Sequence, residues 1–101
     1  MNTDELIKRI RYFRIKSNFS ARKLSLEIHK NETYINKIEK NLFNIPLSVL
    51  FDIIQALGIS YEEFFSDNYM SYEYDKEIMN TLNTLPANMR KIFIDLMKNT
   101  N

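Results

Sequence analysis

Apolar residues recur along this chain every three or four positions, which is the spacing of helices that bury one side. No segment shows the alternation of apolar and polar residues that is typical of a half-buried strand. Residues that cap or break helices divide the pattern into seven predicted helices, five before residue 66 and two after residue 70. The fold class that we predict is therefore all-α.

Serine and asparagine mark most of the predicted helix starts, and residues that tolerate a left-handed backbone mark several ends. The expected N-caps are Asn2 or Thr3, Ser20, Asn31 and Ser60, and the expected stops are Asn18, Asn41 and Gly58. The fourth helix should span 47–57 after Pro46, the fifth should end near Phe65, and the last two should span 71–83 and 86–98. The apolar side of the fourth helix is predicted to comprise Leu47, Leu50, Phe51, Ile54 and Leu57.

Residues 20–40 form the most informative segment. The pattern indicates two short helices joined by a tight turn, with apolar anchors at Leu24, Ile28, Ile35 and Ile38. The small Ser25 stands where two such helices would have to cross closely. This layout is typical of a DNA-binding helix-turn-helix, in which the second helix enters the major groove.

The second helix of this segment has two different sides when its residues are projected at about 100° per residue. Ile35 and Ile38 point toward the core. The opposite side carries Thr33, Asn36, Lys37 and Lys40, with Glu32 at its edge and Tyr34 on the other flank. These side chains offer donors and acceptors for base edges and cations for phosphates. Taken alone, a solvated polar face is the commoner explanation, and the anchor spacing of the whole motif favours DNA binding.

Charge and composition narrow the choice further. The net charge is +1, but residues 1–45 carry ten Lys/Arg and five Asp/Glu, whereas residues 46–101 carry four and eight. Only the N-terminal half is therefore expected to face a polyanion. The chain has no cysteine and one histidine, and it lacks an apolar run long enough for a membrane span or a signal peptide. We expect a soluble cytoplasmic, nucleoid-associated protein without metal or cofactor.

An enzyme is improbable on the same grounds. No nucleophile stands in a recognisable arrangement with a base, and no glycine-rich phosphate loop or metal cluster is present in the sequence. The neighbouring Glu62 and Glu63 are better explained as part of the helix cap that begins at Ser60.

Residues 10–65 resemble the lambda-repressor-like, Cro/CI-type domain of the XRE family, a bundle of five helices that binds DNA. The matching residues are Ile10-Arg-x-x-Arg14, Phe19-Ser20, Leu24, Ile28, Tyr34-Ile-Asn-Lys-Ile-Glu39, Pro46, Leu50, Ile53, Ala56-Leu-Gly-Ile59 and Phe64-Phe65. The run from Asn31 to Glu39 resembles a subgroup common in low-GC Gram-positive bacteria and their mobile elements.

The resemblance assigns roles to individual residues. The base-reading positions are Glu32, Thr33 and Lys37, with Asn36 beside them. The candidate phosphate contacts are Ser20, Ala21, Arg22, Lys23, Asn31, Tyr34 and Lys40, where the backbone N–H groups of Ser20 and Ala21 face the DNA. Arg14 and Glu39 match a structural ion pair between the first and third helices.

The sequence departs from the family pattern at two positions. Ala21 replaces a usual glutamine, so its phosphate or outer-base contact is lost or moved to Arg22 or Lys23. His29 replaces a usual glycine in the turn, which implies an uncommon positive φ or a reshaped turn. Glu32 is open to two explanations, a contact with a cytosine amino group or help in capping the helix.

We place the domain boundary after residue 68, with a helix-turn-helix domain over 1–68 and a two-helix extension over 69–101. A candidate dimer or partner surface comprises Tyr69, Tyr72, Tyr74, Ile92, Phe93 and Leu96. The alternative is that these helices pack on their own domain. The predicted function is a sequence-specific double-stranded DNA-binding transcription regulator, a repressor that binds a palindromic operator as a homodimer. The alternative is an antitoxin or adaptor that binds a regulatory protein partner through its C-terminal helices.

Overall fold

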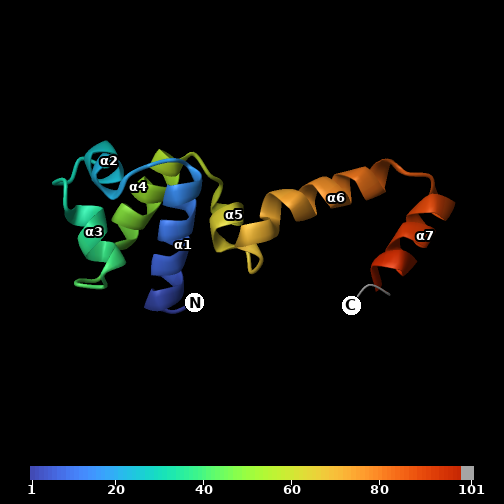
Figure 1. The fold of residues 1–101 in the computed structure, drawn as a ribbon, viewed down its shortest axis with the longest axis horizontal. Coiled ribbons are helices and arrows are strands. Elements are labelled where there is room, and N and C mark those ends of the chain that lie inside the picture. Colours follow the sequence, from blue (N-terminus) through green and yellow to red (C-terminus); the bar gives the residue numbers. More distant parts are fainter. Residues whose placement is uncertain (99–101) are drawn as a thin grey trace. The chain divides into compact units, whose positions relative to one another are not determined.

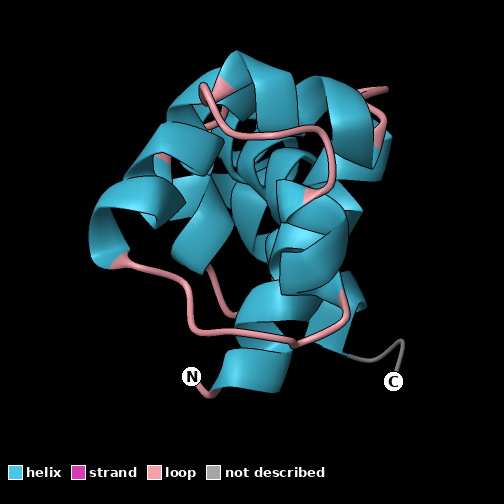
Figure 2. Cartoon of the chain, turned by 90° about the vertical axis from the view of Figure 1, so that its left-hand side faces the viewer, coloured by secondary structure: helices cyan, strands magenta, loops and turns pink. Residues whose placement is uncertain are grey.

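The computed structural model describes residues 1–98, which form seven α-helices and one 3-10 helix (Figures 1 and 2). The helices are α1 (Thr3–Lys16), α2 (Ala21–Glu27), α3 (Tyr34–Glu39), α4 (Leu47–Leu57), α5 (Tyr61–Phe65), η1 (Tyr69–Ser71), α6 (Tyr72–Thr84) and α7 (Ala87–Lys98). No strand occurs in this part of the chain, which confirms the all-α prediction. The chain divides into two compact units between Tyr69 and Met70.

Polar caps fix where several helices begin. The side-chain oxygens of Asn2, Ser20 and Ser60 each accept a hydrogen bond from the backbone N–H three residues later, at 2.9–3.0 Å. Each bond satisfies a donor that the first helical turn leaves unpaired. The predicted N-caps at Ser20 and Ser60 are confirmed, and Asn2 rather than Thr3 caps α1.

Four residues with a left-handed backbone set the turns between the first helices. Asn18, His29, Asn41 and Gly58 have φ between 57° and 69°. Asparagine and glycine adopt this conformation at low cost, whereas histidine pays a steric penalty. The predicted stops at Asn18, Asn41 and Gly58 are therefore confirmed, and His29 adopts the positive φ that replacement of a glycine implied.

The third helix begins later than the sequence pattern indicated. Asn31 does not cap a regular helix, because α3 starts at Tyr34 and the residue that precedes it is Thr33. The Asn31 side-chain oxygen instead accepts from the backbone N–H of Thr33 at 3.1 Å and from its hydroxyl at 2.9 Å. Asparagine favours such local turns. Glu32 and Thr33 consequently lie in the turn before α3.

The first unit encloses an apolar core. The largest fully buried side chains are Phe13, Phe64, Ile10, Leu24, Ile35, Ile38, Ile53 and Ile54. These residues come from α1, α2, α3, α4 and α5, the helices of the first unit in Figure 1. The predicted buried side of α4 is partly wrong, since Leu47 is 65% exposed and Phe51 40% exposed, while Val49 and Ile53 are buried. The helix is apolar on more than one side, so its sequence alone did not fix which side faces inward.

Arg9 closes the end of this unit, a role that the sequence analysis missed. Its Nη1 donates to the backbone oxygens of Phe64 and Ser66, each at 2.7 Å. Its guanidinium carbon lies 4.5 Å from the ring centroid of Tyr69. Tyr69 is buried against Tyr12 and Phe13. Its ring therefore belongs to the core of the first unit, which corrects its assignment to a free dimer or partner surface.

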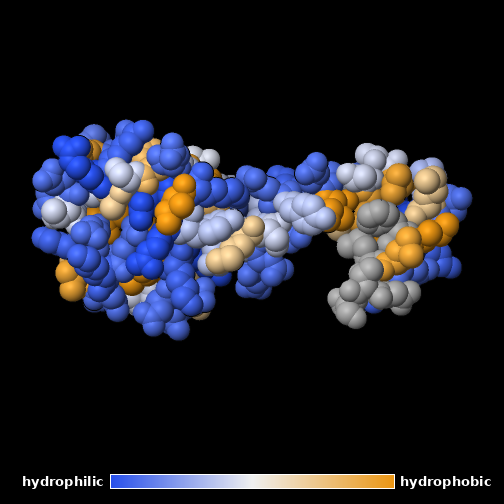
Figure 3. Space-filling view, viewed as in Figure 1, coloured by the Kyte–Doolittle hydropathy of each residue, from blue (hydrophilic) through white to orange (hydrophobic). Residues whose placement is uncertain are grey.

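The second unit consists mainly of α6 and α7. Leu82 is buried, and Arg90 of α7 donates from Nε to the backbone oxygen of Leu82 at 3.0 Å. This contact ties the start of α7 to the end of α6. Several large apolar side chains remain exposed: Met70, Tyr74, Met79, Met89, Ile92, Ile94 and Leu96. Hydrophobic residues are visible on α7 in Figure 3.

Candidate nucleic-acid interface

The joint between α2 and α3 depends on Ser25. Its hydroxyl donates to the backbone oxygen of Ala21 at 2.7 Å and accepts from the backbone N–H of Ile35 at 2.9 Å. Ser25 is completely buried, so a larger side chain would push the two helices apart. The hydroxyl also pairs a donor at the start of α3 that would otherwise be buried without a partner. One small residue thus fixes both the spacing of the helices and their register.

Two arginines of α1 hold the C-terminal end of α3. Arg14 donates to both carboxylate oxygens of Glu39 at 2.7 and 2.9 Å, and its Nη1 donates to the Phe19 backbone oxygen at 2.9 Å. Arg11 adds a 3.1 Å contact to the same carboxylate and a 3.0 Å contact to the Glu39 backbone oxygen. The Glu39 side chain is only 6% exposed. Such two-pronged contacts fix orientation as well as charge, so the structure brings Arg14 and Glu39 together as scaffold.

The outer face of α3, defined by Thr33, Asn36, Lys37 and Lys40, is exposed. Ile35 and Ile38, on the opposite side of the helix, are completely buried. Neither Lys37 nor Lys40 has a carboxylate partner among residues 1–98, whereas Glu39 is neutralised by arginines. Hydrophilic residues cover much of the visible surface around α2 and α3 in Figure 3. The outer face is therefore a polar, positively charged surface on a helix whose other side is fixed in the core.

Two aromatic rings of the first unit lie close to lysine side chains. The Nζ atom of Lys23 lies 4.8 Å from the ring centroid of Phe19. Tyr34 is half-buried, with its ring 5.1 Å from that of Phe43 and 5.4 Å from the Nζ atom of Lys30. Cations favour the faces of aromatic rings. Packing against Phe43 is thus one established role of Tyr34, beside the phosphate contact expected for it.

The remaining residues expected near phosphate occupy the start of α2 and the turn before α3. The Ser20 hydroxyl caps α2, and the Ala21 backbone oxygen accepts from Ser25. The Asn31 side chain is occupied by its two bonds to Thr33. These three residues therefore shape the backbone of the helix-turn-helix. The positively charged side chains among the expected phosphate contacts are those of Arg22, Lys23 and Lys40.

Arg22 and Glu32 form an ion pair that connects α2 to the turn before α3. The Nε atom of Arg22 donates to a carboxylate oxygen of Glu32 at 3.1 Å, and the two side chains are 69% and 61% exposed. The sequence analysis named both residues but did not pair them. Their separation of ten positions matches no regular helical contact, so only the geometry of the turn brings them together.

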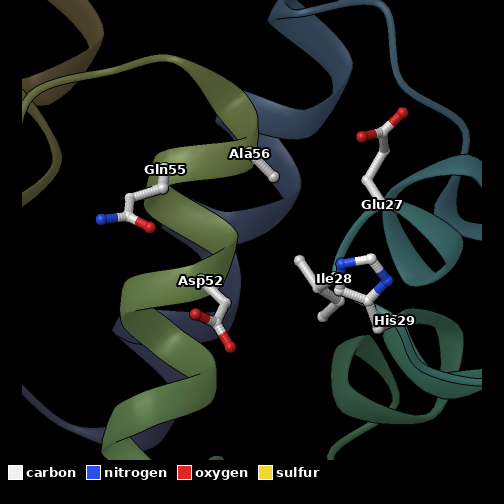
Figure 4. A pocket seen from close by; sticks show the side chains of 6 residues that line it. All are labelled: Glu27, Ile28, His29, Asp52, Gln55 and Ala56. Atoms are coloured by element: carbon white, nitrogen blue, oxygen red, sulfur yellow. The ribbon is translucent and has the colours of Figure 1, made fainter.

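A cavity of about 350 Å³ lies between the end of α2 and α4. Figure 4 shows Glu27, Ile28 and His29 on one side and Asp52, Gln55 and Ala56 on α4.

Among residues 1–98, no group of three histidine, cysteine or acidic side chains is arranged to hold a metal ion. Nor does any helix in that range have the length and apolar character needed to cross a membrane.

Comparison with known families agrees with this geometry. A helix-turn-helix family model of the XRE, lambda-repressor-like type matches residues 10–64, which covers α2, α3 and α4, the second half of α1 and most of α5. No curated protein and no solved structure gives a significant match. The matched family consists of DNA-binding regulatory domains and is not typically enzymatic. The chain therefore belongs to the lambda-repressor-like helix-turn-helix family and carries a DNA-binding domain of the kind that transcription regulators use.

Proposed function

We propose that this protein is a sequence-specific transcriptional repressor that binds double-stranded DNA inside the cell. It places α3 in the major groove of a palindromic operator, and a homodimer occupies the two half-sites. One observation carries this proposal: the outer face of α3 presents Lys37 and Lys40 without carboxylate partners among residues 1–98, while the reverse side is anchored by Ile35 and Ile38. A helix so held presents a fixed pattern of donors to base edges.

The exposed polar residues of α2, of α3 and of the turn between them are proposed to make two kinds of contact, with base edges and with phosphates. Thr33, Asn36 and Lys37 are the proposed base readers, since they are exposed at the turn and first part of α3. Lys40, at the C-terminal end of the helix, and Lys23, on α2, are proposed to contact phosphate. Phosphate contacts set orientation and most of the salt dependence, whereas base contacts set sequence preference. Repression would follow from occlusion of a promoter by the bound dimer.

The exposed apolar residues of α7 support the homodimer. Ile92 and Leu96 are 60% and 61% exposed, and Tyr74 of α6 is 67% exposed. The side chain of Phe93, also expected at this surface, lies outside the residues whose side chains the structure describes. Tyr72 is half-buried. Exposed apolar patches commonly mark contacts between proteins. A two-fold dimer would bind a palindromic operator, because each subunit would contact one of two half-sites related by the same symmetry.

The first experiment is selection of bound duplexes from a random pool, followed by measurement of the mass of the complex. The proposal expects an enriched site with two-fold symmetry and two chains per duplex. Affinity for that site should fall with salt, by about 0.9 log units of binding constant per log unit of salt for each phosphate neutralised. Absence of an enriched duplex would contradict the DNA-binding proposal, and one chain per duplex would contradict the dimer.

Single substitutions then test the roles of the two lysines. Lys37→Ala should relax the preference at one base position and cost about 1–3 kcal/mol on the selected site. Lys40→Ala should weaken binding to all sequences alike and reduce the salt slope by about one. Lys91→Ala, which removes an exposed lysine of α7, is the matched control and should leave DNA affinity unchanged. Unchanged affinity in both Lys37→Ala and Lys40→Ala would mean that the wrong face was assigned.

A second candidate function is an antitoxin or adaptor that binds a protein through α6 and α7. The exposed Met89, Ile92 and Leu96 favour it, since a single helix with such residues commonly packs against a partner. The two functions differ in their response to salt. An adaptor would bind its partner without salt-sensitive affinity for duplex DNA.

A further inference from the structure

The ion pair between Arg22 and Glu32 engages one of the three guanidinium nitrogens of the arginine. Only the Nε atom of Arg22 is bonded to Glu32. Within residues 1–98 its two terminal nitrogens make no hydrogen bond, and both side chains are mostly exposed. A guanidinium engaged at Nε still presents its two terminal nitrogens as a fork of parallel donors.

The neighbouring cation is directed elsewhere. Lys23 lies against the Phe19 ring on the side of α2, whereas Arg22 is drawn toward the turn that precedes α3. Ala21, the first residue of α2, has no polar side chain. Arg22 is thus the side chain of α2 that extends toward the residues proposed to read bases.

We infer that Glu32 is a positioning residue that holds Arg22 so that its two terminal nitrogens read one guanine beside the bases contacted by α3. This inference rests on the proposed DNA binding. Guanine presents two adjacent acceptors, O6 and N7, in the major groove, and an arginine fork is their commonest partner. Glu32 therefore acts through Arg22 rather than by accepting from a cytosine.

Charge supports the same role. An unpaired carboxylate next to Thr33 would repel the phosphates on either side of the groove. Paired with Arg22, it adds no net charge to the surface and fixes one end of a flexible side chain. Exposed ion pairs contribute little to folding, so the variants below should fold like the parent chain, which circular dichroism checks.

The test uses the full chain and the duplex selected from the random pool. We expect Arg22→Ala to remove the preference for one guanine, a preference of roughly 5- to 150-fold for a two-pronged contact. Glu32→Gln should reduce the preference for the same guanine by about two- to fivefold, the range of an exposed ion pair. The double variant Arg22→Ala/Glu32→Gln should bind more tightly than Arg22→Ala, because no bare carboxylate remains.

Glu27→Gln is the matched control, since it makes the same charge change at the other end of α2 and should leave the guanine preference intact. Three results would overturn the inference while leaving DNA binding in place. Glu32→Gln could tighten binding to every duplex with its base preferences unchanged, so that Glu32 only repels phosphate. Arg22→Ala could weaken all sequences equally, so that Arg22 contacts phosphate. The two substitutions could also affect different base pairs. Failure to enrich any duplex would instead overturn the proposed function together with this inference.

Discussion

The two units of this chain stabilise themselves in different ways. The first unit buries eight large apolar side chains completely. Its helices are also joined by charged hydrogen bonds, from Arg9 to the backbone oxygen of Phe64 and from Arg14 to the carboxylate of Glu39. In the second unit, Leu82 is the buried apolar residue among the side chains described, and seven large apolar residues are exposed. Burial of apolar surface is the main stabilising term in folding. The first unit therefore has the features of an independently folded domain, whereas the second unit leaves most of its large apolar side chains exposed.

The largest expected difference in stability between the two units comes from the same substitution at one isoleucine of each unit. Ile35→Ala should lower the free energy of unfolding by about 2–5 kcal/mol, because it leaves a cavity in an enclosed core. Ile92→Ala, at an exposed position of α7, should change it by less than about 0.5 kcal/mol at a protein concentration low enough for the chain to be monomeric. Urea unfolding followed by circular dichroism measures both. If Ile92→Ala lowered the free energy of unfolding as much as Ile35→Ala does, at low as well as at high protein concentration, α7 would already be covered within the monomer.

The next difference is between two arginines that bind carbonyl oxygens. Arg14→Ala should cost about 3 kcal/mol, because Glu39 would remain as a buried carboxylate that only Arg11 still contacts. Arg90→Ala removes hydrogen bonds to the end of α6 but leaves no buried charge, and it should cost about 1 kcal/mol. The midpoints of urea unfolding compare them. An Arg14→Ala variant as stable as the parent would contradict the scaffold role of this residue.

A tyrosine pair tests where the first unit ends. Tyr69→Ala should cost about 2 kcal/mol, because a ring buried against Phe13 and Arg9 is lost. Tyr74→Ala, five residues later and 67% exposed, should be nearly neutral. Thermal unfolding of the two variants gives the comparison. Equal stability would place the boundary before Tyr69 rather than after it.

The smallest effect concerns the left-handed residues, all of which lie in the first unit within the described part of the chain. His29→Gly should raise the free energy of unfolding by less than about 1 kcal/mol, because relief of the steric penalty exceeds the added freedom of the unfolded chain only slightly. His29→Ala keeps the penalty and serves as control. A loss of stability in His29→Gly would show that the imidazole makes a contribution larger than the strain.

The sequence predicted the fold well wherever local chemistry decides the outcome. Gly58 and Pro46 bounded α4 correctly, and Ser20 and Ser60 marked two helix starts, because caps act within one helical turn. The start of α3 was wrong by two residues, since Asn31 can bond to Thr33 in a turn as well as in a helix. The family resemblance of residues 10–65 was confirmed by the matching family model over residues 10–64.

Features that depend on contacts distant in sequence could not be predicted. Arg9 reads as one more surface cation in a basic helix, yet it binds carbonyl oxygens more than fifty residues away. Tyr69 reads as part of a tyrosine-rich tail, yet it packs in the core. Arg22 and Glu32 are ten residues apart in the sequence and pair across the turn that contains His29. In each case the sequence supplies the residue type, and tertiary packing chooses its partner.

The contacts of α1 have a thermodynamic consequence for association. Arg9 fixes the end of α5, and Arg11 and Arg14 fix the end of α3, so one helix joins both ends of the first unit through charged hydrogen bonds. A domain whose helices are held together in this way loses little backbone entropy when it binds duplex DNA. Heat-capacity changes on complex formation would then report desolvated area alone, without the large contribution that accompanies coupled folding.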